Sequence, residues 1–501
     1  MNFANGMKRM ATMTASEKGG TVFTTTGEGK LLDLFATIGG LRHQDIDETV
    51  VKWKQAYAEN PTLAANLILY TRNFRDGGIG ERNIARALYT TLAKLEPVKV
   101  STNFETIANA GRWDDLWYSL VGTSVENQMW DFVVAQLVKD VAAMKEGKPI
   151  SLLAKWMPSC NTSSKATREM ANRLIAYSKI KPRTYRKTLS MLREYLNIVE
   201  RFMSSKDWNS IEFEKVPSKA MSRYIKAFQR NATERFEEYK EKLIKGEAKV
   251  NAAALTPMDI AKKFLTNGGS HYWADSWGSS RAKGKILDEV DFAQWDSLKN
   301  YVTGENEVVI LADLSGSMSS PNYEPIAASI GLATYFAQRN QGTYHGMFLK
   351  FASKPQFVHL SDNVSVEENF KEVLRTPIEY STNLDAAFKA VYDVAKMAND
   401  APRALVIISD GEMDYFMTSN QCDSVVSKWA RKFEELGLTA PKVISWNVAC
   451  RNGTVLAPAS DGVAFVSGYG AGPFGQLNKL INQSAYEAMV EILTQPQFCW
   501  K

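Results

Sequence analysis

Between residues 308 and 319 the chain reads Val308-Val309-Ile310-Leu311-Ala312-Asp313-Leu314-Ser315-Gly316-Ser317-Met318-Ser319. The apolar, largely β-branched first half predicts a buried parallel strand, and the acid, glycine and serines that follow predict a loop at its carboxyl end. Open α/β sheets keep their binding sites at this end of the strands. We therefore expect a site directly after this strand.

The order Asp-x-Ser-x-Ser suits a divalent cation. Asp313 can supply charge to a hard cation, directly or through water, and the hydroxyls of Ser315 and Ser317 are neutral oxygen ligands. Two later segments fit the same site, because Thr382 precedes a helical pattern and Asp410 ends a second buried, apolar run. The sequence thus predicts one site for a divalent cation, with Mg²⁺ the expected ion.

These three loops resemble the metal-ion-dependent adhesion site (MIDAS) of a von Willebrand factor A domain. That family uses Asp-x-Ser-x-Ser, a Thr and an Asp from successive loops, and all five positions are matched here. The third loop reads Ser-Asp-Gly where Thr-Asp-Gly is usual, which leaves the acid in place. A lone Asp-x-Ser-x-Ser would be weak evidence, since both residues are common in turns. The alternative is a degenerate A domain whose loop is only structural.

Strands and helices alternate after residue 305, which predicts a doubly wound, Rossmann-like α/β domain over residues 305–497. Its last expected elements are a strand at 463–467 and a helix at 475–493. The glycines that follow that strand occupy every second position from Gly468 to Gly472. This spacing differs from that of a dinucleotide loop, so we expect no nucleotide cofactor.

Composition limits the remaining possibilities. A chain of 501 residues with 45% apolar and 23% charged residues is long enough for two or three domains and is not disordered as a whole. We expect no membrane segment, because no window approaches about 18 uninterrupted apolar residues. Residues 1–29 are polar and lack a signal-peptide core, so a flexible arm is expected there. Four scattered cysteines indicate a reducing, cytoplasmic setting.

The amino-terminal half is predicted to be helical and basic. Apolar residues recur at helical spacing over residues 30–266, and short breaks between the helices favour an all-α solenoid of HEAT-like units. A Gly- and Ser-rich connecting segment is expected at 267–304. The net charge is +11 over residues 1–300 and −6 over residues 301–501. The first half therefore suits a polyanion.

Two groups of basic residues are candidates for RNA contact. The first lies in or beside the Gly-rich string 75–82, and the second is a tract with interleaved tyrosines; basic groups neutralise phosphates and planar rings stack on bases. Structural ion pairing is the alternative for the first group, and a solvated helix face for the second. The candidates are Arg72, Arg75, Arg82, Lys155, Lys165, Arg168, Lys179, Lys181, Arg183, Arg186 and Lys187.

The whole arrangement resembles the TROVE proteins of the Ro autoantigen type, and more closely a related group in viruses, plants and fungi. Four strings carry that closer resemblance: Arg-Asp-Gly-Gly-x-Gly-Glu-Arg (75–82), Gly-Arg-Trp-x-Asp-Leu (111–116), Lys-Trp-Met-Pro-Ser (155–159) and Val-Pro-Ser-Lys-Ala-Met (216–221). The resemblance implies that the helical repeats close into a ring and bind small structured or misfolded RNAs.

We therefore expect a non-enzymatic RNA-binding protein whose metal-dependent A domain engages a carboxylate on a protein partner. A protein-only adaptor with an incidental basic face is the alternative. A third possibility is an enzyme in which the cation activates water for phosphoryl chemistry. It is the least favoured, because no candidate base or nucleophile accompanies Asp313 and Asp410 in the motif loops.

Overall fold

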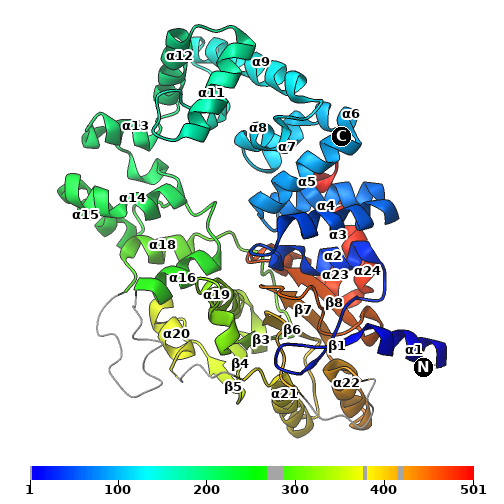
Figure 1. Cartoon of the computed structure of the whole chain (residues 1–501). Coiled ribbons are helices and arrows are strands. Elements are labelled where there is room, and N and C mark those ends of the chain that lie inside the picture. Colours follow the sequence, from blue (N-terminus) through cyan, green and yellow to red (C-terminus); the bar gives the residue numbers. More distant parts are fainter. Residues whose placement is uncertain (1–2, 268–285, 376–380, 416–422) are drawn as a thin grey trace. The chain divides into compact units, whose positions relative to one another are not determined.

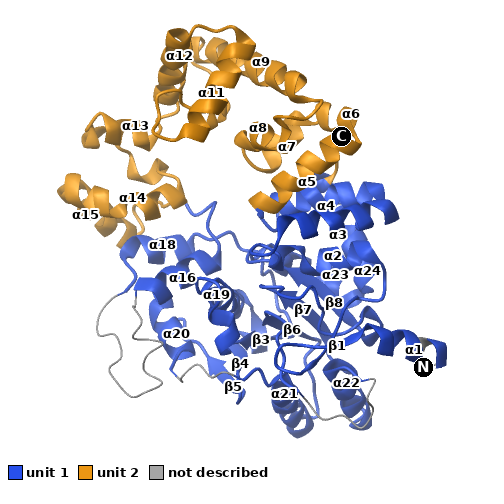
Figure 2. Ribbon diagram, in the orientation of Figure 1, with its two compact units in different colours: residues 1–81, 251–498 blue, residues 82–250, 499–501 orange. Residues whose placement is uncertain are grey.

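A computed structural model describes residues 3–267, 286–375, 381–415 and 423–501 (Figure 1). The chain forms two compact units, coloured separately in Figure 2. Residues 1–81 and 251–498 make up unit 1, and residues 82–250 with 499–501 make up unit 2. The division differs from the boundaries suggested by the sequence, because the first 81 residues group with the α/β part of the chain rather than with the helical region.

In the described part of the chain, unit 1 is built around a six-stranded sheet with the order β5-β4-β3-β6-β7-β8. Neighbouring strands are parallel except at the β5 edge, where β5 runs antiparallel to β4. This mixed, mostly parallel sheet confirms the α/β part of the prediction. The strands are β3 (Val308–Asp313), β4 (Met347–Phe351), β5 (Gln356–His359), β6 (Ala404–Ser409), β7 (Lys442–Asn447) and β8 (Val463–Ser467).

Helices cover the sheet (Figure 1). Helix α19 packs on β3, β4 and β6, and α21 contacts β4 and α22. Toward the β8 edge, α2, α23 and α24 pack on the last strands. The bounds are α2 (Lys30–Thr37), α19 (Glu324–Arg339), α20 (Val366–Val373), α21 (Leu384–Ala398), α22 (Val425–Glu435), α23 (Leu477–Asn482) and α24 (Ala485–Leu493).

Three helices at the start of the predicted helical region belong to this core: α2, α3 (Ile46–Glu59) and α4 (Pro61–Arg72). Phe35 of α2 stacks on Tyr70 of α4 with ring centroids 5.4 Å apart, and Tyr70 meets the edge of Phe498 at 5.2 Å. Helical periodicity shows that a face is buried but not what covers it. The sequence therefore gave no reason to assign these helices to the sheet.

The predicted amino-terminal arm has defined structure from residue 3 onward. Helix α1 (Phe3–Thr12) leads into an antiparallel hairpin of β1 (Met13–Ala15) and β2 (Thr21–Phe23). Several contacts join it to the rest of unit 1; among them, Arg9 pairs with Asp461 at 2.6 Å, and the Phe23 N–H donates a 2.9 Å hydrogen bond to Val455 O.

The connecting segment predicted at 267–304 is described only in part, because residues 268–285 lie outside the described residues. After them, α18 (Glu289–Asp296) contacts α16 (Pro257–Asn267), which packs on α19. Trp295 of α18 is buried, and its indole N–H donates a 2.8 Å hydrogen bond to Gln338 Oε1. This end of the segment is thus part of the unit 1 core.

Unit 2 is helical in every described element, which confirms the helical character predicted for this region; the HEAT-like solenoid stays a prediction. None of the helices described in the chain is long and apolar enough to cross a membrane. The helices of unit 2 are α5 (Arg82–Leu95), α6 (Pro97–Ser101), α7 (Phe104–Ala110), α8 (Asp114–Leu120), α9 (Glu126–Lys145), α10 (Leu153–Trp156), α11 (Lys165–Ser178), α12 (Pro182–Tyr195), α13 (Val199–Ser204), α14 (Ser218–Asn231) and α15 (Thr233–Ile244).

Candidate metal site

The Asp313 carboxylate lies at the carboxyl end of β3. It accepts a 2.9 Å hydrogen bond from the Ser315 N–H on Oδ1 and a 2.6 Å bond from the Ser409 hydroxyl on Oδ2. The chain then turns through a short 3-10 helix at 316–319, which places the hydroxyl oxygens of Ser315 and Ser317 3.1 Å apart. One acid and two hydroxyls therefore cluster at the end of this strand, as the sequence predicted.

The other two predicted residues lie on neighbouring loops. Asp410 directly follows β6, the parallel neighbour of β3. Thr382 precedes α21 and is held by Asp414: its N–H donates a 2.9 Å hydrogen bond to Asp414 Oδ2, and the Asp414 N–H donates a 3.1 Å bond to Thr382 O. The Thr382 loop is therefore fixed by the same segment that carries Asp410.

Two basic side chains that the sequence analysis did not single out show that these loops converge. Lys18 Nζ donates hydrogen bonds to Thr382 Oγ1 at 2.6 Å and to Ser317 Oγ at 3.4 Å. Arg451 Nη2 donates a 2.7 Å bond to Ser317 O and lies 3.6 Å from Asp410 Oδ2. One ammonium and one guanidinium thus reach three different loops. No local pattern marks either residue, because the contacts are between distant parts of the chain.

The two acids are electrostatically costly in the absence of a cation. Burial raises the pKa of Asp313, although the hydrogen bonds from Ser409 and Ser315 oppose that effect. Burial, followed by the nearby charge of Asp313, also raises the pKa of Asp410. Two carboxylates held close together in a buried place favour either protonation or a compensating positive charge.

The donor set fits a hard divalent cation. Two carboxylates and three hydroxyls offer only oxygen atoms, the ligands such cations prefer. Asp410 Oδ2 is buried and has no hydrogen-bond partner among the described residues, so it is the atom that a cation would satisfy. The described residues contain no group of three or more His, Cys, Asp or Glu side chains able to hold a metal. The proposed site at the ends of β3 and β6 has only two acids, and serine and threonine hydroxyls provide its other oxygen ligands.

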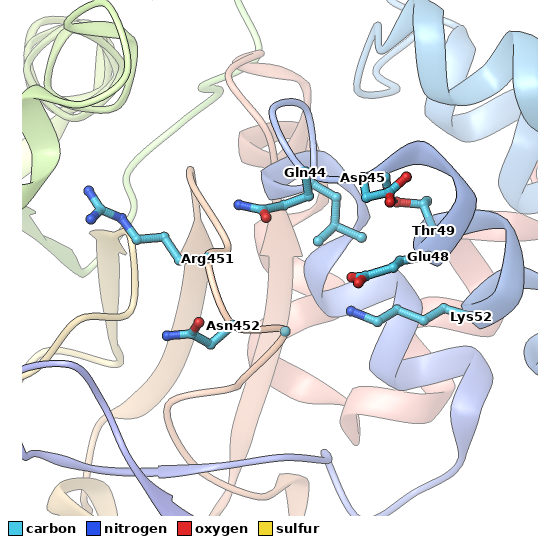
Figure 3. Close-up of a pocket in the computed structure, with 9 residues that line it drawn as sticks. Gln44, Asp45, Glu48, Thr49, Lys52, Arg451 and Asn452 are labelled. Carbon is cyan, nitrogen blue, oxygen red and sulfur yellow. Dashed lines mark hydrogen bonds between the residues drawn. The ribbon is translucent and has the colours of Figure 1, made fainter.

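A polar cavity of about 260 Å³ adjoins this site through Arg451. Figure 3 shows Asp45, Glu48 and Lys52 along the start of α3, with Arg451 and Asn452 on the loop that follows β7. Arg451 therefore lines the cavity and also reaches Asp410 and Ser317.

The basic candidates for RNA contact differ in exposure. Arg72 is 7% exposed and is not available to a phosphate in this conformation. In the Gly-rich string, Arg75 and Arg82 are exposed. In the basic tract, Lys155 and Arg168 are half-buried. The other members of the tract are exposed, namely Lys165, Lys179, Lys181, Arg183, Arg186 and Lys187.

The Gly-rich string 75–82 also has a structural role within unit 1. A Cβ added at Gly472 would lie 2.6 Å from Gly77 O, so the two glycine loops approach each other at backbone distance. Glu81 is buried and pairs with Arg42 at 2.5 Å. These contacts favour the structural alternative for most of this string.

Two of the four sequence strings that resemble the viral, plant and fungal group, 111–116 and 155–159, pack together in unit 2. Arg112 lies over the ring of Trp156, 4.0 Å from its centroid, and the Tyr185 hydroxyl donates a 2.7 Å hydrogen bond to Pro158 O. Arg193 donates 2.9 Å bonds to Ala154 O and Ser159 Oγ. The strings at 111–116 and 155–159 therefore meet and are tied to α12.

Two sequence models match the chain in succession. Residues 127–305 match a domain of unknown function, DUF2828, and residues 307–482 match a second one, DUF7788. An uncharacterized protein of Acanthamoeba polyphaga mimivirus is 27% identical over 510 residues, which cover 92% of this chain and 84% of the viral protein. This relative agrees with the expected resemblance to viral proteins, while the resemblance to the TROVE proteins stays a prediction.

The solved structures offer only a distant likeness. Proximal thread matrix protein 1 from the mussel byssus, with a zinc-occupied MIDAS motif, is 13% identical over 36% of this chain and 48% of that chain, with a TM-score of 0.25. A second crystal form gives the same identity and coverage with a TM-score of 0.24. The chain thus spans about half the length of that protein. Likeness of this degree supports no conclusion about function.

Proposed function

We propose that this chain is a non-enzymatic binding protein that holds a divalent cation at the ends of β3 and β6. Asp313 and Asp410 would supply the charge, and the hydroxyls of Ser315, Ser317 and Thr382 the neutral ligands. The observation that carries this proposal is the buried Oδ2 of Asp410, which accepts no hydrogen bond from the described residues. The match of all five residues to the adhesion site of von Willebrand factor A domains supports it, and Mg²⁺ is the ion we favour.

The partner would be a protein that presents an Asp or Glu side chain. A hard divalent cation with free coordination positions accepts a further carboxylate oxygen. Arg451, which lies between the polar cavity and Asp410, would add a positive charge beside that carboxylate. Activation of water by the cation is a weaker alternative, because Ser409, Lys18 and Arg451 contact the five residues as hydrogen-bond donors, and the carboxylate of Asp414 already accepts the Thr382 N–H.

The test is cation-dependent binding with a matched variant. The full chain is immobilised, exposed to native extract with Mg²⁺, and eluted with EDTA; the Asp410→Asn variant serves as the control. We expect a partner that is released by EDTA, is not retained by Asp410→Asn, and loses binding when one of its acidic residues is changed to the amide. Partner binding that is unchanged by EDTA and by the Asp410→Asn substitution would refute the proposal.

RNA binding by unit 2 is the second candidate function. Residues 179–187 contain five basic side chains and no acid. All five are exposed, and none forms an ion pair within the described residues. Unpaired positive charge of this density suits a phosphate backbone. A protein-only adaptor, in which this face has no ligand, is the alternative.

A further inference from the structure

The proposed metal site is closed by the chain's own amino-terminal segment, residues 16–20. The Gly20 N–H donates a 3.0 Å hydrogen bond to Met413 O, and the Glu17 N–H donates a 2.8 Å bond to Glu412 Oε2. The segment therefore lies against the loop that follows Asp410, and the side chain of its central lysine enters the site. We call residues 16–20 the strap.

Four of the five proposed ligands are almost fully buried when the strap is in place. Asp313, Ser315 and Thr382 are 0% exposed and Asp410 is 2% exposed. Ser317, the fifth proposed ligand, is partly exposed, but its hydroxyl and that of Thr382 accept hydrogen bonds from Lys18, so a partner carboxylate finds these positions occupied in the closed form. The proposed function therefore needs a second conformation in which the strap has left the site.

The strap carries one side chain in place of the proposed cation and another in place of the partner's carboxylate. The ammonium of Lys18 sits on the hydroxyls of Thr382 and Ser317, the oxygens that would face the cation. The carboxylate of Glu17 lies 3.7 Å from Arg451 Nη1, beside the position proposed for the partner's carboxylate. A cation and an acid from the same segment thus take the places of the metal and of the partner.

We propose that the strap is an autoinhibitory internal ligand, in which Lys18 competes with the divalent cation for the hydroxyls of Ser317 and Thr382. The inference rests on the proposed function, because it assigns a regulator to the same site. Two positive charges at the same pair of oxygens repel each other, and the lone pairs that accept from the ammonium are those that a metal would use. Cation binding and strap binding therefore exclude each other.

The backbone of the strap is adapted to this close approach. A Cβ added at Gly20 would lie 2.3 Å from Met413 O, a distance that backbone atoms cannot tolerate. Gly19 has a φ of +81°, the left-handed region that favours glycine. The pair of glycines lets the chain turn directly against the loop after Asp410 and deliver the preceding lysine. A methyl group at Gly20 should hold the strap away without changing any proposed ligand.

The experiment measures Mg²⁺ affinity of the metal-free full chain by calorimetry. Lys18→Met removes the ammonium, Gly20→Ala displaces the strap by a different route, and Lys8→Met removes an exposed lysine of α1 as the control. We expect Lys18→Met and Gly20→Ala to bind at least about tenfold more tightly than the wild type, a typical size for coupling within one chain. Lys8→Met should bind like the wild type.

A second measurement follows the strap itself. Hydrogen exchange at the amides of Glu17 and Gly20 should become faster when the wild type is saturated with Mg²⁺, because both amides are bonded to the loop in the closed form. Equal Mg²⁺ affinity in the wild type, Lys18→Met and Gly20→Ala would overturn the strap proposal and leave the metal site standing. Absence of binding in all of them would overturn the metal site and the strap together.

Discussion

The hydroxyl of Ser409, the last residue of β6, donates a 2.6 Å hydrogen bond to Oδ2 of Asp313, the last residue of β3. The other oxygen of Asp313 accepts from the Ser315 N–H. Both oxygens of Asp313 are thus held by the protein, whereas Asp410 Oδ2 has no such partner. The two acids therefore differ: both oxygens of Asp313 are oriented by hydrogen bonds, whereas Asp410 Oδ2 accepts no hydrogen bond from the described residues and has the guanidinium of Arg451 nearby, at 3.6 Å.

Ser409→Ala should weaken the site and the fold. Loss of a buried hydrogen bond to a carboxylate costs about 1.5–3 kcal/mol of the free energy of unfolding. Removal of the group that orients a metal ligand lowers affinity about 10–100-fold. Urea unfolding and Mg²⁺ titration measure the two effects. Ser409→Thr, which keeps the hydroxyl, is the control and should resemble the wild type; an unchanged affinity in Ser409→Ala would contradict the role assigned to this hydrogen bond.

Asp410→Asn should separate stability from binding. Burial and the charge of Asp313 raise the pKa of Asp410, so the folded protein without metal disfavours its charged form. A neutral amide removes that penalty, and we expect a Tm of the metal-free protein at or above that of the wild type. The increase in Tm produced by Mg²⁺ should disappear. A lower Tm without metal, together with a retained response to Mg²⁺, would argue against this reading of Asp410.

Lys350 should make the stability depend on pH. Its ammonium is buried on β4 and donates a 2.6 Å hydrogen bond to Val373 O; burial lowers its pKa from 10.5 to about 8. Between those values the unfolded chain binds the proton and the folded chain does not. The free energy of unfolding should therefore rise as the pH increases from about 8 toward 10.5. Urea unfolding across this pH range should show a smaller rise in the free energy of unfolding for Lys350→Met than for the wild type. An equal rise would mean that other groups cause the pH dependence.

Gly39→Ala should destabilise unit 1 through the contact between its amino-terminal helices and its sheet. An added Cβ would lie 2.5 Å from Gly468 N, directly after β8. Overpacking of this kind costs about 1–3 kcal/mol. Gly475→Ala is the matched control, because its nearest neighbour would lie at an ordinary 3.6 Å. Similar unfolding free energies for the two variants would mean that this contact is not tight.

Charge reversal on α12 tests the second candidate function. The double variant Arg183→Glu, Lys187→Glu should weaken binding of single-stranded or structured RNA. The slope of log affinity against log salt should fall by about one for each lost phosphate contact. Lys245→Glu, at another exposed lysine of unit 2, is the control. No RNA binding by the wild type at low salt, or equal binding by all three proteins, would favour the protein-only adaptor.

Much of the α/β region follows from local pattern. Strand β8 spans 463–467, as predicted, and β6 (404–409) is the apolar run that was expected to end at Asp410. The helix expected at 475–493 is instead divided into α23 and α24. Ser484 caps the second helix and Glu487 completes the capping box, a signal that was present in the sequence.

The strap could not have been predicted. Lys18 meets Thr382 across 364 positions, and nothing in a polar, Gly-rich segment indicates which distant loop it will contact. Arg451 likewise lies in a loop after β7 with no motif around it. The five proposed ligands could be predicted because they lie in loops of a known order, four of them at or directly after the ends of β3 and β6 and Thr382 before α21, whereas the groups that cover them depend on tertiary packing alone.

The most direct test of the metal site is anomalous diffraction from crystals of the Lys18→Met variant soaked in Mn²⁺. The account predicts one peak bounded by oxygen atoms of Asp313, Ser315, Ser317, Thr382 and Asp410, at about 2.0–2.4 Å from those that bind the ion directly. The same peak should be weaker in the wild type, where Lys18 holds Ser317 and Thr382. A map from the variant with no peak at the ends of β3 and β6 would contradict the central claim.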